Sequence, residues 1–257
     1  MWSMLKELFG RRELLAMLVS RNIKIRYKNS VLGFFWTLLG PIFLILIYGV
    51  FLGLLKIEIP LPLLVISILV WQFLASCLGD SLNAILGSSN LVTKTAFPRA
   101  SLPVSIVLAN LVNFALTLLV LVPFLVFYRS DFGALYWLPL IVLTNVVLCI
   151  GFSLIVSVSN VFLRDTEHIL SVVMLAWFFL SPVVYPMSLL AGYPSWTHVV
   201  YFLNPMSGLI VAYRNVFTSL DYVSPWLMMI SFSVCWLIGL LGAWVFHTMD
   251  PKLGDEL

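Results

Sequence analysis

Residues 31–55 read VLGFFWTLLGPIFLILIYGVFLGLL and contain no charged side chain. A helix needs ~20 mainly apolar residues to cross the hydrocarbon core of a bilayer. Inside the membrane the backbone groups must pair with one another. A continuous run of apolar residues achieves this pairing as an α-helix. A membrane β-barrel would instead show short strands in which apolar and polar residues alternate. The stretch therefore predicts a membrane-spanning helix.

The rest of the chain repeats this pattern. Hydrophobic residues make up 62% of the 257 residues and charged ones only 10%, against about 45–50% and about 25% in soluble domains. We predict an all-α integral membrane protein with an N-terminal segment (1–30) and a six-helix transmembrane domain (31–257). The predicted spans are 31–55, 61–86, 102–127, 135–163, 169–191 and 225–248.

The basic residues predict the orientation. If these six spans form, only Lys56, Arg129 and Arg214 of the 14 Lys and Arg residues fall on one side. Cytoplasmic loops carry the excess of Lys and Arg, so the other side and both termini are predicted to be cytoplasmic. The basic residues on that side are Lys6, Arg11, Arg12, Arg21, Lys24, Arg26, Lys28, Lys94, Arg99, Arg164 and Lys252.

The N-terminal segment predicts an amphipathic helix at the membrane surface. Its apolar side chains fall close to one helical face and its basic ones on another: Leu14, Leu15, Leu18 and Ile25 against Arg21, Lys24 and Lys28. We favour attraction of these cations to anionic headgroups. The alternative is that they contact a phosphate-bearing substrate.

Residues 181–224 are apolar and aromatic but are interrupted by Pro182, Pro186, Pro194 and Pro205. The stretch is too short for two more spans. Irregular backbone is tolerated at membrane depth where protein or a water-filled cavity surrounds it. We predict a re-entrant pair of short helices entering from the outer side. The alternative is a long outer loop lying on the interface.

Polar side chains within the spans predict contacts between helices, because they are costly in lipid. Asp80, Asn110, Asn113 and Asn145 are expected to form such hydrogen bonds. Asn160, Arg164 and Asp165 cluster at the predicted cytoplasmic end of the fourth span. Since Asn160 and Arg164 are four residues apart, they would share a helical face, and we expect a helix-end network.

The spans contain aromatic residues that could face lipid or line a passage for sugar rings. The candidates for such a path are Trp36, Tyr48, Trp71, Phe73, Trp177, Phe178 and Tyr185. No catalytic constellation, phosphate-binding loop or metal-binding pattern is recognisable. The three histidines are scattered, and the three cysteines sit in apolar runs without a disulfide-like spacing.

Five motifs together carry a resemblance. They are RYKNSVLGFFWTLLGP (26–41), NLVTKTAFPRASLP (90–103), NVFLRD (160–165), SPVVYP (181–186) and LNPMSGLIVAYRNVF (203–217). In this order they resemble the permease subunit of type-2 ABC exporters that move polysaccharides, the O-antigen and teichoic-acid permeases. The resemblance covers nearly the whole chain.

The resemblance implies a homodimer with a pore at its two-fold interface in the bacterial cytoplasmic (inner) membrane. Two copies of a separate ATPase chain would bind ATP and Mg, leaving this chain without a cofactor or catalytic role. The substrate would be a polysaccharide linked to undecaprenyl pyrophosphate. The chain would also contact membrane lipids, and nucleic acid would not be a partner. The re-entrant helices would form an outer gate.

The resemblance also assigns a coupling helix to residues 90–97. Asn90 is a suitable N-cap and Pro98 would end the helix. The apolar side chains of the segment suit docking in a groove of the ATPase. The coupling residues would be Asn90, Leu91, Val92, Thr93, Lys94 and Phe97.

Other functions stay open on the residues alone. The same fold could export teichoic acid, or small hydrophobic drugs or lipids. A membrane-embedded transferase is a third alternative, but it would need an acidic or histidine site that the sequence does not show.

Overall fold

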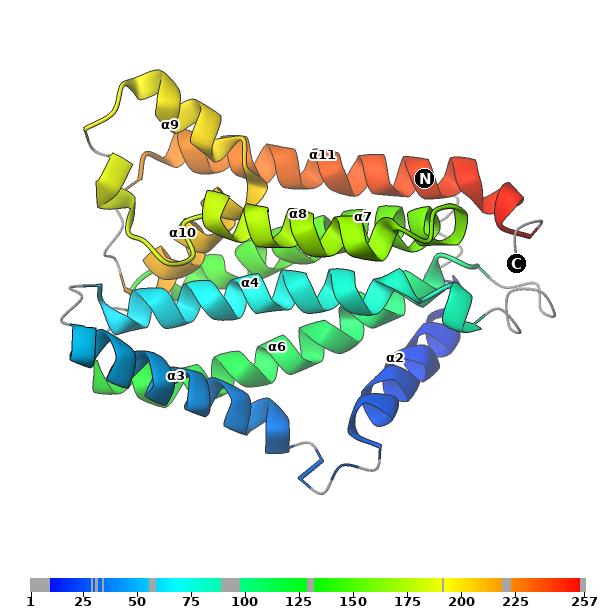
Figure 1. Cartoon of the computed structure of the whole chain (residues 1–257), viewed down its shortest axis with the longest axis horizontal. Coiled ribbons are helices and arrows are strands. Elements are labelled where there is room, and N and C mark those ends of the chain that lie inside the picture. The colour runs from blue at the N-terminus through cyan, green and yellow to red at the C-terminus, as the bar shows by residue number, and fades with distance from the viewer. Residues whose placement is uncertain are drawn as a thin grey trace.

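The structure is a computed structural model that describes residues 10–28, 30, 32–33, 35–55, 59–88, 98–128, 132–190, 192–218 and 223–254. Over these ranges the chain forms helices and turns without a β-strand (Figure 1). The long helices are α2 (Arg12–Tyr27), α3 (Phe35–Leu55), α4 (Leu61–Leu82), α6 (Ser101–Phe127), α7 (Leu138–Phe162) and α11 (Pro225–Met249). The shorter ones are α8 (Thr166–Leu180), α9 (Ser195–Phe202) and α10 (Pro205–Phe217), with 3-10 turns η1 (Leu86–Ser88), η2 (Leu135–Trp137), η3 (Met187–Leu190) and η4 (Asp250–Gly254).

Among the described residues, five helices are long and apolar enough to cross a membrane. These are α3, α4, α6, α7 extended by η2, and α11 extended by η4. They match the first four and the last of the predicted spans, although α4 ends at Leu82 rather than at residue 86. The described part of the chain is thus all-helical, and several of its helices are long and apolar enough to span the membrane.

The predicted fifth span, 169–191, differs from the structure. The helix there, α8, ends at Leu180 after 15 residues. At about 1.5 Å per residue it is roughly 22 Å long, shorter than the ~30 Å hydrocarbon core. Ser181 is extended, with φ −107° and ψ 151°. It precedes Pro182, whose ring disfavours helical geometry in the preceding residue, so the chain leaves the helix and continues into η3.

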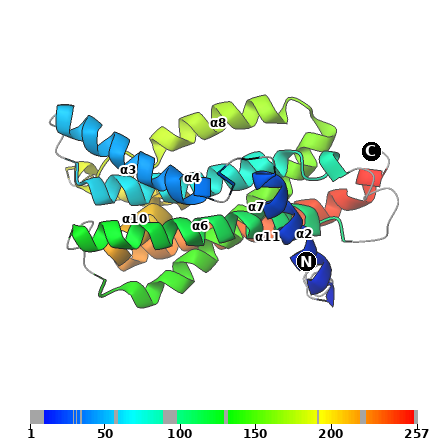
Figure 2. The same ribbon diagram turned by 90° about the horizontal axis from the view of Figure 1, so that it is seen from below.

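The spanning helices run along the long axis of the molecule (Figures 1 and 2). One end, which we call the basic end, carries α2, the turn between α7 and α8, and η4 (Figure 1). The opposite end carries η2, α9 and α10 (Figure 1). The two short helices α9 and α10 occupy the proline-rich segment for which the sequence predicts a re-entrant pair.

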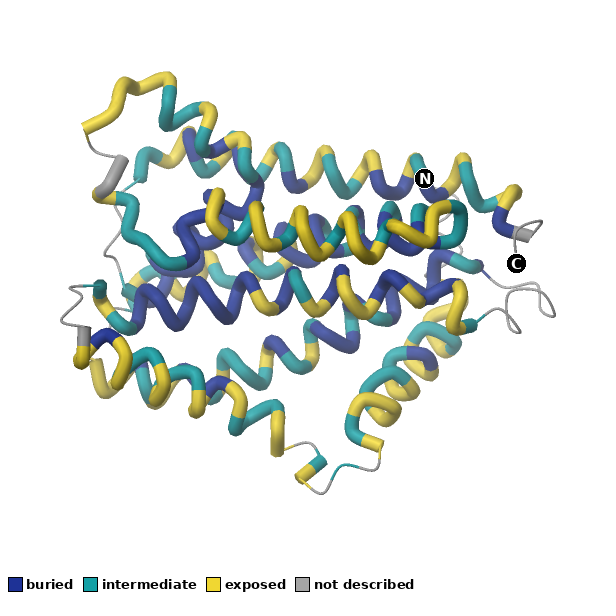
Figure 3. Tube along the Cα trace, in the orientation of Figure 1, coloured by how far each residue is buried: buried dark blue, intermediate teal, exposed yellow. Residues whose placement is uncertain are grey.

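Burial divides the helices into a centre and a periphery (Figure 3). The central helix α4 packs against α3, α6, α7, α8 and α10, and most of its side chains are buried. Nearly all of α10 is buried as well. In contrast, α8 has no buried residue, and α3 is largely exposed. The apolar surfaces of α3 and α8 are therefore available to lipid or to another chain.

The helices α7 and α11 approach each other closely because glycine residues lie where they cross. A Cβ atom added to Gly151 of α7 would lie 2.5 Å from the carbonyl oxygen of Ile238 and 2.8 Å from the Cα of Gly239 on α11. Both neighbours are backbone atoms and cannot rotate away. Small residues at such crossings allow helix backbones to approach closely in membranes.

We expect Gly151→Ala to destabilise the protein, because the new methyl group forces α7 and α11 apart. Overpacking of this kind typically costs about 1–3 kcal/mol. Thermal unfolding of the purified protein in detergent measures the effect. Gly79→Ala in α4 is the matched control, since its Cβ would meet nothing within 4 Å. A melting temperature of Gly151→Ala equal to that of Gly79→Ala would contradict the packing.

Candidate functional site

An ion pair joins the N-terminal helix to the bundle at the basic end. Arg26 of α2 donates from Nη2 to the Asp80 carboxylate of α4, and also to Asn110 Oδ1 of α6 at 2.8 Å. Asn110 Nδ2 in turn donates to Asp80 Oδ2 at 2.9 Å. The three groups satisfy one another, which confirms the prediction that Asp80 and Asn110 bond between helices.

Two further contacts fasten α2 along α6. Asn22 Nδ2 donates to Ser105 Oγ at 3.0 Å, and the Tyr27 hydroxyl donates to Asn113 Oδ1 at 3.0 Å. Leu18 is buried beneath them, whereas Ile25, predicted to lie on the same apolar face, is exposed. The helix α2 is thus docked on protein through mixed polar and apolar contacts.

Docking leaves the three predicted phosphate-binding cations accessible. Arg21 and Lys24 are exposed on α2, and Lys28 is exposed directly after its end. Within the described part of the chain, the ion pairs are Arg26–Asp80 and Arg99–Asp250, so none of the three has a carboxylate partner there. Their charge is available to an anion.

The predicted helix-end network forms only in part. Asn160 Nδ2 donates to the Leu82 carbonyl at 2.9 Å and to Asn83 Oδ1 at 3.4 Å, which joins the ends of α7 and α4. The helix α7 ends at Phe162 and Leu163 is extended. Arg164 therefore does not share a helical face with Asn160, and both Arg164 and Asp165 are exposed.

The predicted coupling residues Asn90, Leu91, Val92, Thr93, Lys94 and Phe97 lie outside the described residues. The chain that follows them is firmly placed. Arg99 Nη1 donates to the Asp250 carbonyl of η4 at 2.6 Å. Ala100 belongs to an apolar cluster with Leu18 of α2 and Leu253 of η4. The C-terminal turn η4 and α2 thus meet the bundle at the start of α6.

A fully buried arginine organises the opposite end. Arg214 of α10 is 0% exposed. Its Nε donates to Ser67 Oγ of α4 at 2.7 Å, and its Nη2 donates to the carbonyl oxygens of Pro182 and Tyr185, the latter at 3.2 Å. The side chain therefore ties the turn after α8 to both α4 and α10.

Asn204 forms a second link at this end. Its Nδ2 donates to Ser181 Oγ at 2.9 Å, and its Oδ1 accepts from Trp177 Nε1 at 2.8 Å. The same oxygen caps α10 by accepting from the Met206 N–H at 3.1 Å. The end of α8 and the start of α10 are consequently fixed to one another.

The predicted path aromatics separate into two groups. Phe73 stacks on Phe114 with ring centroids 4.7 Å apart, and Trp71 is buried between Trp177 and Phe178. These two serve the core of the single chain. The more accessible group consists of Trp36, Tyr48, Trp177, Phe178 and Tyr185, of which Trp36 is exposed and the others are half-buried.

Comparison with known protein families shows to which family the chain belongs. Residues 13–218 match the family model described as ABC-2 type transporter. The chain belongs to this family. The matched range contains α2 from Glu13 onward and all of α10, so the docked N-terminal helix and the buried Arg214 lie within the family domain.

Full-length relatives agree with this assignment. An O-antigen export system permease protein RfbA of Myxococcus xanthus is 34% identical over 218 residues, covering 83% of this chain and 84% of that protein. Another of the same name from Klebsiella pneumoniae is 28% identical over 254 residues, covering 95% of each chain. Membership of a family of ABC permeases makes this chain a transport subunit.

Two residues that organise the site were not predicted from sequence. From the sequence, Arg26 is one of the cations that predict the orientation, and Arg214 is a basic residue on the predicted outer side. The signal for Arg214 was present, because it interrupts the apolar stretch GLIVAY–NVF and charges within membrane segments mark functional positions. The sequence carries no comparable signal for Arg26, because only the fold brings it close to Asp80.

We expect Arg214→Met to lower the melting temperature by roughly 5–15 °C. The substitution leaves buried carbonyl groups without a donor, each at about 1–3 kcal/mol. Arg12→Met, on the exposed surface of α2, is the control and should change it little. Thermal unfolding in detergent checks both variants. Equal melting temperatures would show that Arg214 does not hold the turn in place.

Proposed function

We propose that this chain is the permease subunit of an ATP-driven exporter that moves polysaccharide linked to undecaprenyl pyrophosphate, O-antigen or a related surface glycan, across the bacterial inner membrane. The similarity to O-antigen export permeases along the length of the chain carries the proposal. Both termini lie in the cytoplasm, as the distribution of basic residues favours.

The pore forms between two copies of the chain. Supporting this, α3 and α8 expose apolar side chains that their own bundle leaves uncovered, including Phe43 and Ile47 on α3 and Val172 and Phe179 on α8. Burying these faces at a two-fold axis places Trp36, Tyr48, Trp177 and Phe178 near the dimer interface. The flat apolar faces of their rings suit the C–H faces of sugars.

The driving force comes from partner ATPase subunits, which hold the ATP and Mg. Residues 90–97 dock in a groove of each ATPase. Movement passes from this segment to Pro98 and Arg99, and the Arg99–Asp250 hydrogen bond connects it to α11 through η4. A force applied to residues 90–97 would thus be passed to α6, to α2 and, through η4, to α11.

The lipid pyrophosphate enters at the basic end. Arg21, Lys24 and Lys28 are exposed cations on α2 and at its C-terminal end, and α2 is docked on α4 and α6. This arrangement suits the attraction of a doubly charged phosphate group. At the opposite end, the short helices α9 and α10 form the outer gate of the pore, and Arg214 and Asn204 hold their junction with α8.

We expect Phe97→Asp to abolish export while leaving basal ATP hydrolysis by the partner intact, because a carboxylate cannot enter an apolar groove. The conservative Thr93→Ser should behave like the parent. The measurements are surface polysaccharide on cells and ATPase activity of the co-purified complex. Normal export by Phe97→Asp would count against the coupling role.

A second test concerns the cations. We expect the triple variant Arg21→Gln/Lys24→Gln/Lys28→Gln to reduce export at least about tenfold, since each cation near a phosphate-rich surface contributes about 1 kcal/mol. The control Arg12→Gln/Arg164→Gln/Lys252→Gln removes the same charge from the same end. Equal loss in both variants would show that only overall charge matters.

A further inference from the structure

The central helix α4 is exposed along one narrow face only. Its exposed residues are Gln72, Ser76, Gly79 and Asp80, and Asn83 continues the line at the C-cap. Their spacing of four, three, one and three residues puts them on one side of an α-helix. We call this face the polar stripe. It contains no apolar side chain, whereas the exposed faces of α3 and α8 are largely apolar.

The polar stripe reaches the middle of the membrane. Gln72 lies roughly 17 Å along α4 from Leu61, at about 1.5 Å per residue, and the hydrocarbon core is about 30 Å thick. Within the described part of the chain, the side chains of Gln72 and Ser76 have no hydrogen-bond partner. Polar groups at this depth face a water-filled cavity or the interior of an assembly, because lipid offers them no hydrogen bond.

The same face of α4 is apolar in its outer half. There it carries Leu61, Val65 and Leu69, which pack in or against the core cluster that includes Leu52 of α3. Toward the basic end α3 diverges from α4 (Figure 1), and the face becomes exposed and polar from Gln72 onward. The loss of cover thus coincides with the change from apolar to polar residues. A surface intended for lipid would have stayed apolar.

The chemistry of the polar stripe suits a sugar chain. Amide groups carry both donors and acceptors of hydrogen bonds, and hydroxyl groups do both as well, so they match the hydroxyl groups of a glycan. The charge of Asp80 is offset by Arg26. Over their described lengths α3, α4 and α8 contain no Lys or Arg, the residues that line pores for phosphate and other anions.

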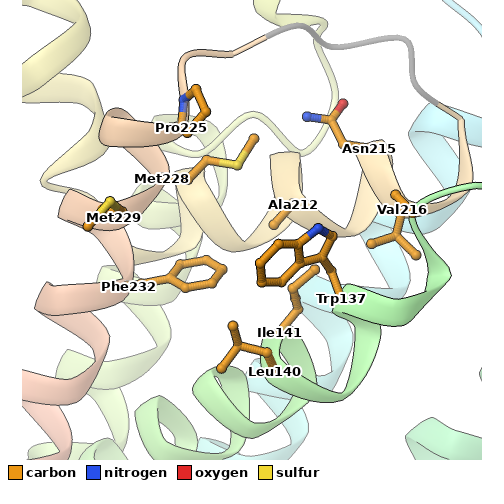
Figure 4. A pocket seen from close by; sticks show the side chains of 11 residues that line it. Trp137, Leu140, Ile141, Ala212, Asn215, Val216, Pro225, Met228, Met229 and Phe232 are labelled. Carbon is orange, nitrogen blue, oxygen red and sulfur yellow. The ribbon is translucent and has the colours of Figure 1, made fainter.

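An apolar pocket elsewhere in the bundle lacks this chemistry. It measures about 400 Å³ and lies between η2, α7, α10 and α11 (Figure 4). Trp137, Leu140, Ile141 and Phe232 contribute to its lining. Sugar hydroxyl groups that entered it would lose their hydrogen bonds to water without replacement.

We propose that the polar stripe lines the water-filled path of the exported chain, and that this chain is a glycan without charged groups. The inference rests on the proposed function and narrows its substrate class, since it excludes a phosphate-rich polymer such as teichoic acid. The cations of α2 would meet only the lipid pyrophosphate at the entrance. Along the path, Gln72 and Ser76 exchange hydrogen bonds with successive sugars.

Thiol labelling tests whether the polar stripe faces water. Ser76→Cys and the control Ser233→Cys each replace an exposed serine of a spanning helix, and the native cysteines are buried. The probe is a trimethylammonium methanethiosulfonate, applied to inside-out vesicles that contain the chain with its ATPase. We expect Ser76→Cys to react at least about tenfold faster, because the charged probe does not enter lipid.

Equal labelling rates of the two variants would overturn the proposal. If Ser76→Cys is unlabelled and instead forms a disulfide with its counterpart, a second copy of the chain covers the polar stripe and the proposal is wrong. Neither result depends on export, so both leave the proposed function standing.

Export by variants tests the contact with sugars. We expect Gln72→Leu to lower surface polysaccharide at least about fivefold, the size of one lost hydrogen bond, at an unchanged melting temperature. The control Ser233→Leu replaces an exposed polar residue of α11 with the same side chain and should export like the parent. Normal export by Gln72→Leu would refute the contact.

A comparison of two polymers tests the substrate class. Cells that lack their own exporter receive the chain with its ATPase, and make either a neutral glycan or one with a phosphate in every repeat, both on the same lipid pyrophosphate. We expect the neutral glycan to reach the surface at least about tenfold more, because the path offers phosphate no cation. Equal export of both would overturn the neutral class. Export of neither would contradict the proposed function, and with it the glycan as occupant.

Discussion

The buried guanidinium of Arg214 is the constraint on which the opposite end of the molecule depends. Burying a charge is costly unless its hydrogen bonds are met, and the groups that meet them here come from α4 and from the turn after α8. If the turn moved away from α10, the carbonyl groups of Pro182 and Tyr185 would lose their donor, and the buried Arg214 guanidinium would lose these hydrogen bonds. One side chain thereby fixes where α8 ends and where the short helices begin. Asn204 reinforces the same junction through Trp177 and Ser181.

The basic end is joined by a different kind of contact. Arg26 and Asp80 are partly exposed, with 33% and 44% of their side chains accessible, and pairs of this kind contribute about 0–1 kcal/mol each. Their value is mainly in position: together with Asn110 they set the angle at which α2 lies against α4 and α6. The link at the basic end is thus partly exposed, whereas the one made by Arg214 at the opposite end is fully buried.

Between the ends, rigidity is concentrated in the centre. The contact of α7 with α11 is as close as backbone allows at Gly151, and α4 and α10 are almost wholly buried. The apolar faces of α3 and α8 remain uncovered by their own bundle. In the proposed dimer these exposed faces would be covered by the second copy.

The sequence by itself determined that the chain is helical and crosses the membrane, because lipid leaves the backbone few alternatives and long apolar runs such as residues 31–55 are unambiguous. It also predicted that Asp80, Asn110, Asn113 and Asn145 bond between helices, since polar groups in lipid need partners. Only the tertiary structure decided which partners they take. It placed Arg26 beside Asp80, stacked Phe73 on Phe114 in the core and buried Arg214. The hydrogen bonds of Arg26 and Arg214 join residues 29 to 147 positions apart, and the spacing of residues along one helix carries no information about such contacts. Arg164 is separated from Asn160 for a local reason, because α7 ends at Phe162.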